Sequence, residues 1–345
     1  MNAGPCYPLR DQKERKVKRI AYRAFGDPAK VCRIEDVAEP APPGLGEALV
    51  EIIAFPINPS DLLRIEGKHR FRPAFPAQPG SESVARVLGV GPSVTSVKPG
   101  DVVVPTIGES WVQRRTLPAT SLLSVDPKAD PHQLSVLRGL PGTAWYMLED
   151  HGPREPGGWV LQTAANSGVG LSLAMLARDR GLKTVNIVRR RDAMDAVKRA
   201  GGDVVLLDEP HATLAERVLA ATGGERPKAC FDAVAGPITR AIADCLADHA
   251  PIAVYGLLSG KPCEVTPQQL IFHGISMVGY SLPASIARRT PEVAQRDYMA
   301  LSRLVASGRL TVPILATYPL AAIATALRHA AEGSRDGKIL VLANA

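Results

Sequence analysis

One stretch, residues 159–192, constrains the fold more than any other part of the chain. It opens with a short apolar run that ends at Gln162, passes through a turn of small residues, and then shows apolar residues at helical spacing until Gly181. A second apolar run, 184–188, leads into three consecutive arginines. This order of strand, turn, helix and strand predicts a βαβ unit and therefore a parallel sheet.

The turn before the helix predicts a phosphate site. Its small residues are followed by the start of the helix, and the relevant positions are Asn166, Ser167, Gly168, Val169 and Gly170. Free amides at a helix N-terminus bind a pyrophosphate, and small side chains let the phosphates approach the backbone. The strict glycine-rich fingerprint is absent because Ala165 stands at its first glycine. The surrounding strands and helix therefore carry the prediction of a dinucleotide site.

The end of the second strand distinguishes between the two nicotinamide cofactors. An NAD-binding unit carries Asp or Glu there for the ribose 2′-hydroxyl, whereas a 2′-phosphate is bound by arginine. This chain has Arg189, Arg190 and Arg191 at that position. Guanidinium groups bind phosphate through paired hydrogen bonds, so the sequence predicts NADPH. The alternative is a solvated basic loop.

Length and composition indicate a two-domain enzyme. The 345 residues allow separate cores, and 46% hydrophobic with 22% charged residues is an ordinary composition. No apolar run reaches the ~20 residues of a membrane helix, and the first 20 residues are basic without the apolar core of a secretory signal. We therefore expect a cytoplasmic protein with no membrane partner. The net charge of +7 is dispersed and aromatics make up only 5%, so nucleic acid is not the expected partner.

The pattern of apolar runs and turns changes near residue 131. Before it, short apolar runs separated by Pro- and Gly-rich turns predict a compact, antiparallel, barrel-like β domain. After it, strands alternate with helices, which predicts a doubly wound parallel sheet that ends near 276–279. The last strand, 338–342, is expected to return to the first domain. We expect one domain of residues 1–130 with 286–345 and a second of 131–285.

Five short blocks occur in order along nearly all of the chain. They are Ile57-Asn58-Pro59-Ser60-Asp61, Gly80-Ser81-Glu82, Lys98-Pro99-Gly100-Asp101, the Gly168-Val169-Gly170 turn and Gly337-Lys338-Ile339. With them the chain resembles the medium-chain dehydrogenase/reductase superfamily, whose zinc-dependent members keep a cysteine near the first block and a histidine in the second. Here those places hold Asn58, Ser60 and Ser81. The resemblance implies an α/β fold, with a GroES-like β-rich catalytic domain and a Rossmann-type sheet, and no catalytic metal. The five scattered cysteines, none in a C-x-x-C pair, also indicate no structural zinc.

Within the zinc-free branch, the chain resembles the mitochondrial-type trans-2-enoyl-thioester reductases. The blocks that carry this are 162–170, 184–191, 143–148, 255–256 and 270–272 with 279–282. The resemblance implies that hydride from NADPH reduces the C=C bond of an α,β-unsaturated thioester at its β-carbon. The substrate would be a small molecule or a carrier-linked acyl group, for which Lys68, Arg70 and Arg72 offer positive charge.

The resemblance also gives individual residues their roles. The pyrophosphate would be held by the turn residues 166–170, and the 2′-phosphate by Arg189, Arg190 and Arg191. The path to the nicotinamide would be lined by Tyr255, Gly256, Leu257 and Leu258, and the nicotinamide would be flanked by Tyr280, Ser281 and Leu282. Lys338 would reach the cofactor, and Thr143 would face the nicotinamide amide. For two of these residues, a purely structural role stays open as the alternative. Thr143 is also a hydroxyl near a helix N-terminus, and Lys338 is also a solvated lysine before an edge strand.

Two departures touch the reacting end of the substrate. The family's catalytic tyrosine lies twelve residues after Ile57, a position held here by His69, and a family asparagine corresponds to Leu140. We predict His69, Asn58 and Thr143 as catalytic residues. An imidazole with a pKa near 6.5 can stabilise the enolate oxygen or deliver a proton. The alternative is a surface loop histidine.

Two other functions stay open on these departures. A zinc-free quinone or alkenal reductase shares Asn58, Thr143 and Lys338 and needs no dedicated proton donor. A catalytically reduced chain would bind NADPH and serve as a partner protein. Independently of the function, the apolar last strand, 276–282, predicts a homodimer, because an edge of this kind is commonly covered by a second subunit.

Overall fold

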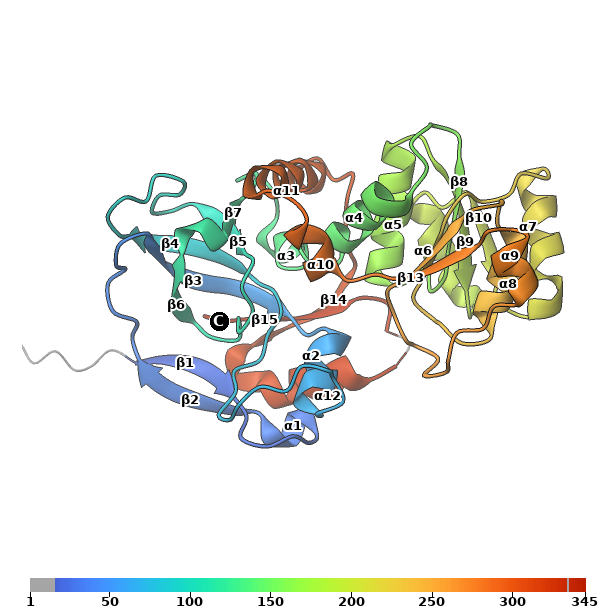
Figure 1. Ribbon diagram of the computed structural model, residues 1–345. Coiled ribbons are helices and arrows are strands. Elements are labelled where there is room, and N and C mark those ends of the chain that lie inside the picture. Colours follow the sequence, from blue (N-terminus) through green and yellow to red (C-terminus); the bar gives the residue numbers. More distant parts are fainter. Residues whose placement is uncertain (1–15, 334) are drawn as a thin grey trace, which may run out of the picture. The chain divides into compact units, whose positions relative to one another are not determined.

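The structure is a computed structural model and describes residues 16–333 and 335–345. Most of the basic segment used above to exclude a secretory signal, together with Cys6, lies outside the described residues. Contacts divide the described chain into two units, which Figure 1 shows coloured along the sequence. Unit 1 comprises residues 16–122, 317–332 and 340–345, and unit 2 comprises 123–316 and 333–339.

Unit 1 is rich in antiparallel strands. Its elements, with those at its borders, are β1 (Lys16–Ala21), α1 (Pro28–Val31), β2 (Arg33–Ala38), β3 (Glu47–Pro56), α2 (Pro59–Ile65), β4 (Val84–Val90), β5 (Val102–Pro105), β6 (Arg114–Pro118), β7 (Leu122–Ser124), β14 (Ile314–Pro319), α12 (Ile323–Ala331) and β15 (Lys338–Leu342). The long strand β3 pairs with β4, β6 and the end of β15, all antiparallel. Alternate residues of β3 are buried, and the stacked rings of Phe55 and Trp111 lie fully inside.

Unit 2 contains a six-stranded parallel sheet. Its strands are β8 (Trp159–Gln162), β9 (Lys183–Val188), β10 (Val204–Leu207), β11 (Cys230–Asp232), β12 (Pro251–Val254) and β13 (Ser276–Gly279), in the spatial order β10-β9-β8-β11-β12-β13. Its helices are α3 (Pro131–Leu134), α4 (Pro141–His151), α5 (Gly168–Asp179), α6 (Met194–Arg199), α7 (Leu214–Thr222), α8 (Ile238–Cys245), α9 (Pro267–Ile271), α10 (Leu282–Ala287) and α11 (Pro291–Ala306). The strand order reverses beside β8, which places the first turn at a topological switch point.

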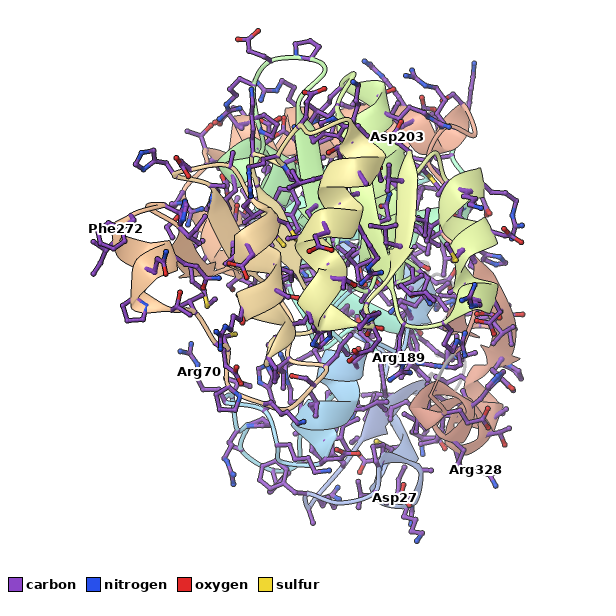
Figure 2. The ribbon with its side chains drawn as sticks, turned by 90° about the vertical axis from the view of Figure 1, so that its right-hand side faces the viewer. Asp27, Arg70, Arg189, Asp203, Phe272 and Arg328 are labelled. Carbon is purple, nitrogen blue, oxygen red and sulfur yellow. The ribbon has the colours of Figure 1, made fainter. Side chains whose placement is uncertain are left out.

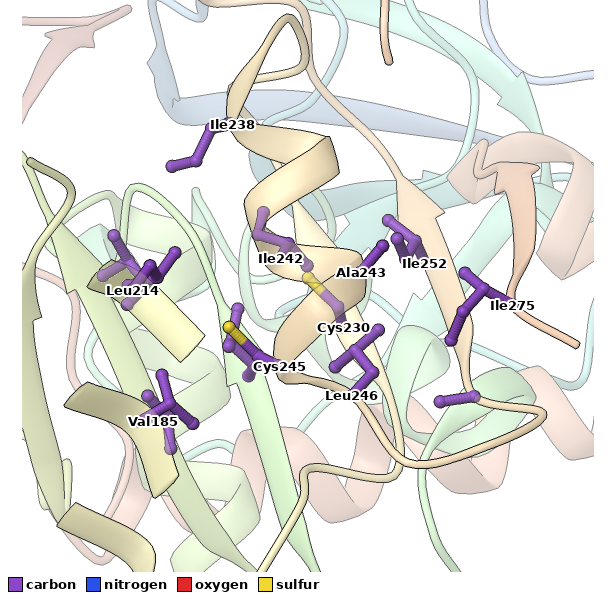
Figure 3. Close-up of a cluster of buried hydrophobic side chains, with 14 of the residues drawn as sticks. Val185, Leu214, Cys230, Ile238, Ile242, Ala243, Cys245, Leu246, Ile252 and Ile275 are labelled. Carbon is purple, nitrogen blue, oxygen red and sulfur yellow. The ribbon is translucent and has the colours of Figure 1, made fainter. Parts of the chain in front are cut away.

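Helices cover both faces of this sheet. On one face Leu214 of α7 and Ile242 of α8 pack with Val185 and Ile252, a cluster drawn in Figure 3. On the other face, α5 and α6 pack against the neighbouring strand residue Val188. Successive side chains of a strand point to opposite faces, so both faces of β9 are apolar and buried. The predicted doubly wound sheet is confirmed.

The predicted domain boundary differs from the structure after β13. Residues 286–316 were expected with the first domain, but they pack with unit 2. The helix α11 buries Tyr298 and Leu301, and the Tyr298 ring lies edge-on to Tyr146 of α4 at 6.1 Å between centroids. An amphipathic helix pattern does not say which domain receives its apolar face, so the sequence could not assign it. Within the described ranges, no helix combines the length and apolarity needed to span a membrane.

Candidate cofactor and active site

The predicted phosphate turn lies between β8 and α5. Ser167 caps α5, and its Oγ accepts a hydrogen bond from the Gly170 amide at 3.1 Å. A Cβ added to Gly170 would lie 2.5 Å from the Ala165 carbonyl oxygen, so only glycine fits there. Asn166, Ser167, Gly168 and Val169 are partly exposed at this helix N-terminus. Small residues and a 12-residue helix with free amides fit a pyrophosphate.

Polar side chains at and after the ends of β8 and β11 hold the turn in place. The Gln162 amide donates to the Gly170 carbonyl at 2.9 Å and to Asn186 Oδ1 at 2.7 Å. The Thr163 hydroxyl donates to Asp232 Oδ1 at 2.5 Å. Asp232, fully buried at the end of β11, also accepts from the Val234 and Ala235 amides. The sequence prediction missed Asp232, because only pairing between β8 and β11 brings it to the turn.

The three arginines follow β9 at the carboxyl end of the sheet. Figure 2 shows Arg189 at one end of the sheet and Asp203 at the other. Arg190 is paired with Asp192 at 3.1 Å and with Asp336 at 3.5 Å. Arg189 and Arg191 are exposed, and neither forms an ion pair with another described residue. These two guanidinium groups are therefore available to an anion such as a 2′-phosphate.

The next predicted segment begins directly after β12. Burial raises the pKa of Tyr255, whose side chain lies next to that of Ser167. Gly256 approaches the neighbouring loop so closely that a Cβ would lie 2.4 Å from the Ala233 carbonyl oxygen. The structure thus brings Tyr255 to the phosphate turn. Leu257 and Leu258 are both exposed.

The segment after β13 is fixed to α4. The Tyr280 amide donates to the Val254 carbonyl at 2.8 Å, and burial raises the pKa of the Tyr280 hydroxyl to about 12. Ser281 precedes the short helix α10, which begins at Leu282. Below them, Arg289 pairs with Asp150 of α4 at 2.6 Å.

The pair formed by Asp150 and Arg289 is mostly buried. Asp150 also accepts from the Ser285 hydroxyl at 2.5 Å and pairs with Arg288 at 2.9 Å. The Arg289 guanidinium lies over the Tyr146 ring, 4.3 Å from its centroid. These contacts hold the segment that carries Tyr280, and sequence reasoning did not find them.

Thr143 lies in α4 and Lys338 at the start of β15. Thr143 is buried in the first turn of α4, and its hydroxyl donates to the Gly139 carbonyl at 2.7 Å. The hydroxyl oxygen keeps acceptor capacity towards an amide donor. Lys338 begins β15, and its backbone amide donates to the Pro313 carbonyl at 2.8 Å.

Unit 1 contains a buried polar cluster at the places of the zinc ligands, formed by Asn58, Asp61, Ser81 and Glu82. The Asn58 amide nitrogen Nδ2 donates to Glu82 Oε1 at 2.8 Å and to Ser81 Oγ at 3.3 Å. Asp61 Oδ2 accepts from the Asn58 backbone amide at 3.0 Å and from Ser81 Oγ at 3.3 Å. Burial raises the pKa of the Asp61 carboxyl to about 6. Across the described residues, no three His, Cys, Asp or Glu side chains form a group able to hold a metal ion.

His69 lies in the loop after α2 and is half-buried. Its ring Nδ1 accepts a hydrogen bond from the Phe71 amide at 3.1 Å, and its own backbone amide donates to the Leu63 carbonyl at 3.1 Å. Because Nδ1 accepts this hydrogen bond, Nε2 is the ring nitrogen that can donate. The neighbouring Arg70 is exposed, as Figure 2 shows.

Two family models match the chain. The alcohol dehydrogenase GroES-like domain matches residues 44–121, and the zinc-binding dehydrogenase model matches residues 168–297. The first lies in unit 1 and the second in unit 2, in agreement with the predicted architecture.

Similar proteins cover almost the whole chain. A mitochondrial enoyl-[acyl-carrier-protein] reductase of Caenorhabditis elegans is 32% identical over 96% of this chain and 97% of its own length. A Bacillus thuringiensis structure described as an NADPH:quinone reductase has a TM-score of 0.86 at 26% identity, covering 95% of this chain and 99% of its own. A mycobacterial protein solved with NADPH has a TM-score of 0.81 at 28% identity, covering 94% and 99%.

The prediction of a cytoplasmic location is contradicted. The similar enoyl-[acyl-carrier-protein] reductases of worm, mouse and human are mitochondrial. The prediction used the lack of an apolar secretory core, which argues against secretion only. A basic, amphipathic targeting segment has no such core, so this test does not separate the cytoplasm from an organelle.

The matched ranges include parts of the predicted site in both units. Unit 2 carries the phosphate turn with Arg189 and Arg191, and unit 1 carries Asn58 and Ser81 where the zinc-dependent enzymes have ligands. The chain belongs to the medium-chain dehydrogenase/reductase superfamily, in its zinc-free branch, as an oxidoreductase of the enoyl-reductase type.

Proposed function

We propose that this chain reduces the C=C bond of an α,β-unsaturated thioester with NADPH as its cofactor. The observation that carries the proposal is the similarity to an enoyl-[acyl-carrier-protein] reductase over nearly the full length of both chains. The exposed Arg189 and Arg191 support the choice of NADPH over NADH. The acyl group would be free or carrier-linked.

Unit 2 supplies the residues for the cofactor. Bound NADPH supplies a hydride from its nicotinamide to the β-carbon of the substrate. The amides at the start of α5 would hold the pyrophosphate, and Arg189 and Arg191 the 2′-phosphate. Tyr280 and Ser281 would flank the nicotinamide, in a segment held rigid by the pair of Asp150 and Arg289. A preorganised segment keeps the hydride donor in one orientation.

His69 would stabilise the negative charge that develops on the thioester oxygen. The Phe71 amide occupies Nδ1, so the proton lies on Nε2 and can be donated to that oxygen. Asn58 lies in the buried polar cluster of unit 1, and Thr143 would accept from the nicotinamide amide. His69 would take over the oxyanion-stabilising role of the family's tyrosine, which this chain lacks.

The direct test is NADPH oxidation with a panel of acceptors. We expect turnover with crotonyl and hexenoyl thioesters, measured as the loss of NADPH absorbance. Turnover with quinones or free enals but with no enoyl thioester would reject the thioester and support a quinone or alkenal reductase. The similar quinone reductase structure and His69 in place of tyrosine make that the second candidate. NADPH binding without reduction of any acceptor would indicate a partner protein.

Replacement of His69 by alanine should lower kcat at least tenfold. A donor to a developing oxyanion contributes on the order of 10²-fold or more to the rate, and the partly exposed site weakens that contribution. NADPH affinity should stay the same, because His69 belongs to unit 1 and the proposed cofactor residues to unit 2. Steady-state kinetics together with NADPH fluorescence separate the two effects. Unchanged kcat would leave His69 as an ordinary loop histidine.

We propose a homodimer formed along the edge strand β13. It is the last strand of the parallel sheet, and large apolar side chains near it are exposed, namely Leu257, Leu258, Leu270, Ile271 and Phe272. Phe272 is 76% exposed and projects outward in Figure 2. Exposed apolar groups beside an unpaired sheet edge favour association with a second copy. Light scattering should give twice the monomer mass, and a monomer at micromolar concentration would contradict this.

A further inference from the structure

One buried acid near the predicted catalytic residues has no role in the mechanism above. Asp61 is 1% exposed, and its Oδ1 has no hydrogen-bond partner among the described residues. Its Oδ2 lies 3.3 Å from the hydroxyl of Ser81, which is partly exposed. Ser81 therefore connects a buried carboxyl to the accessible side of the cluster.

The surroundings of Asp61 favour its protonated form. Burial opposes the ionised carboxylate, and the buried Glu82 carboxylate on the segment before β4 adds to this. Arg64 on the same helix and the hydrogen bonds from Asn58 and Ser81 oppose the shift. The remaining titratable neighbour, Tyr22 after β1, has its own pKa raised by burial. The resulting pKa of about 6 is high enough for Asp61 to serve as a proton donor near neutral pH.

We propose that Asp61 delivers, through the Ser81 hydroxyl, the proton that the substrate α-carbon receives. This inference rests on the proposed function and names its proton source. The Ser81 hydroxyl donates to Asp61 Oδ2 in the structure. When Asp61 is protonated, this hydrogen bond reverses, so that Asp61 donates to Ser81 Oγ and the Ser81 hydroxyl turns to the substrate. When the hydride has reached the β-carbon, the enolate α-carbon forms a C–H bond with the Ser81 proton. The Ser81 oxygen takes the Asp61 proton in the same step, which leaves the Asp61 carboxylate, and NADP⁺ is the oxidised product. Solvent then returns a proton to Asp61 through Ser81.

This relay explains how the chain works without the tyrosine of its family. His69 would donate from Nε2 to the oxyanion, so the proton for the α-carbon comes from a different group. Asp61 and Ser81 come from α2 and from the segment before β4, and the cluster holds them together through Asn58. Ser81 would be the catalytic group, and Asp61 acts through it.

The test uses the full chain with an Asp61→Asn variant. Asparagine keeps an oxygen acceptor for the Asn58 amide but carries no transferable proton. In the wild type, kcat for a crotonyl thioester should fall as pH rises above about 6, because Asp61 loses its proton. D61N should lower kcat at least tenfold and remove this fall, with KM and NADPH affinity within twofold. Asp27→Asn, at the exposed N-cap of α1, is the matched control and should leave both unchanged.

A second readout is independent of activity. The folded state keeps the Asp61 proton up to about pH 6, whereas an unfolded aspartate loses it near about 3.9. Stability contributed by the protonated group is present below the lower value and lost as pH rises through the higher one. The melting temperature of D61N minus that of the wild type should therefore increase as the pH is raised from 4 to 7.

The outcomes separate the relay from the proposed function. Wild-type kcat and pH profile in D61N would overturn the relay while enoyl reduction stands. If D61N does not fold, Ser81→Ala should reproduce the loss of kcat and Ser81→Thr should restore it, and equal activity of both would also overturn the relay. Absence of enoyl reduction in the wild type would reject the proposed function, and the melting curves would still test the protonation of Asp61.

Discussion

Replacing Arg189 and Arg191 together by alanine is expected to weaken NADPH binding by about a hundredfold or more and to leave NADH binding within threefold. Hydrogen bonds to charged groups contribute about 1.5–3 kcal/mol each. Both side chains are exposed and unpaired among the described residues, so no existing ion pair has to break before they bind the 2′-phosphate. NADH lacks this phosphate and loses nothing.

The matched control for this prediction is Arg190→Ala. Arg190 already pairs with Asp192 and Asp336, so its removal should change NADPH affinity less than tenfold. Titration of cofactor fluorescence compares the wild type and the two variants with both cofactors. An equal loss for NADPH and NADH would show that the arginines support the fold of the loop and not the 2′-phosphate.

The second large effect is on stability. Arg289→Ala should lower the free energy of unfolding by about 3–5 kcal/mol, because the Asp150 carboxylate loses its main buried partner. The two side chains are 15% and 14% exposed, and their contact joins the segment after α10 to α4. Tyr280 lies before α10 in the same stretch of chain after β13, so NADPH affinity should fall as well.

The neighbouring arginine is a built-in control. Arg288 binds the same carboxylate, but its side chain is 61% exposed. Exposed pairs contribute about 0–1 kcal/mol, so Arg288→Ala should be close to neutral. Urea unfolding followed by fluorescence compares the two variants. Equal destabilisation by both would show that burial of the pair does not decide its contribution.

Apolar runs were enough to predict most of the parallel sheet. The predicted apolar run 184–188 lies within β9, and β13 has the bounds 276–279 at which the sheet was expected to end. The pairing of β1 with β2 was not predicted. Two of its cross-strand pairs are ion pairs, Lys18 with Asp36 and Arg19 with Glu35, and in β1 they separate the buried apolar residues Val17 and Ile20. The apolar residues of β1 therefore do not form a continuous run.

The site was predictable where one local segment carries it. The turn at Ser167 and the arginine at 189 each follow a strand directly, so their place at the sheet end follows from the chain order. The supporting acids Asp61, Asp150 and Asp232 could not be found in this way. Each is defined by partners on other elements, and a single sequence does not show which distant residues meet.

The central claim is that NADPH hydride reaches the β-carbon of an enoyl thioester. The most direct measurement supplies NADPH deuterated at nicotinamide C4, on the transferred side, together with a crotonyl thioester in ordinary water. Mass spectrometry and NMR of the saturated product should find one deuterium, at the β-carbon. A product without deuterium, deuterium at the α-carbon, or oxidation of NADPH with no saturated thioester would contradict the claim.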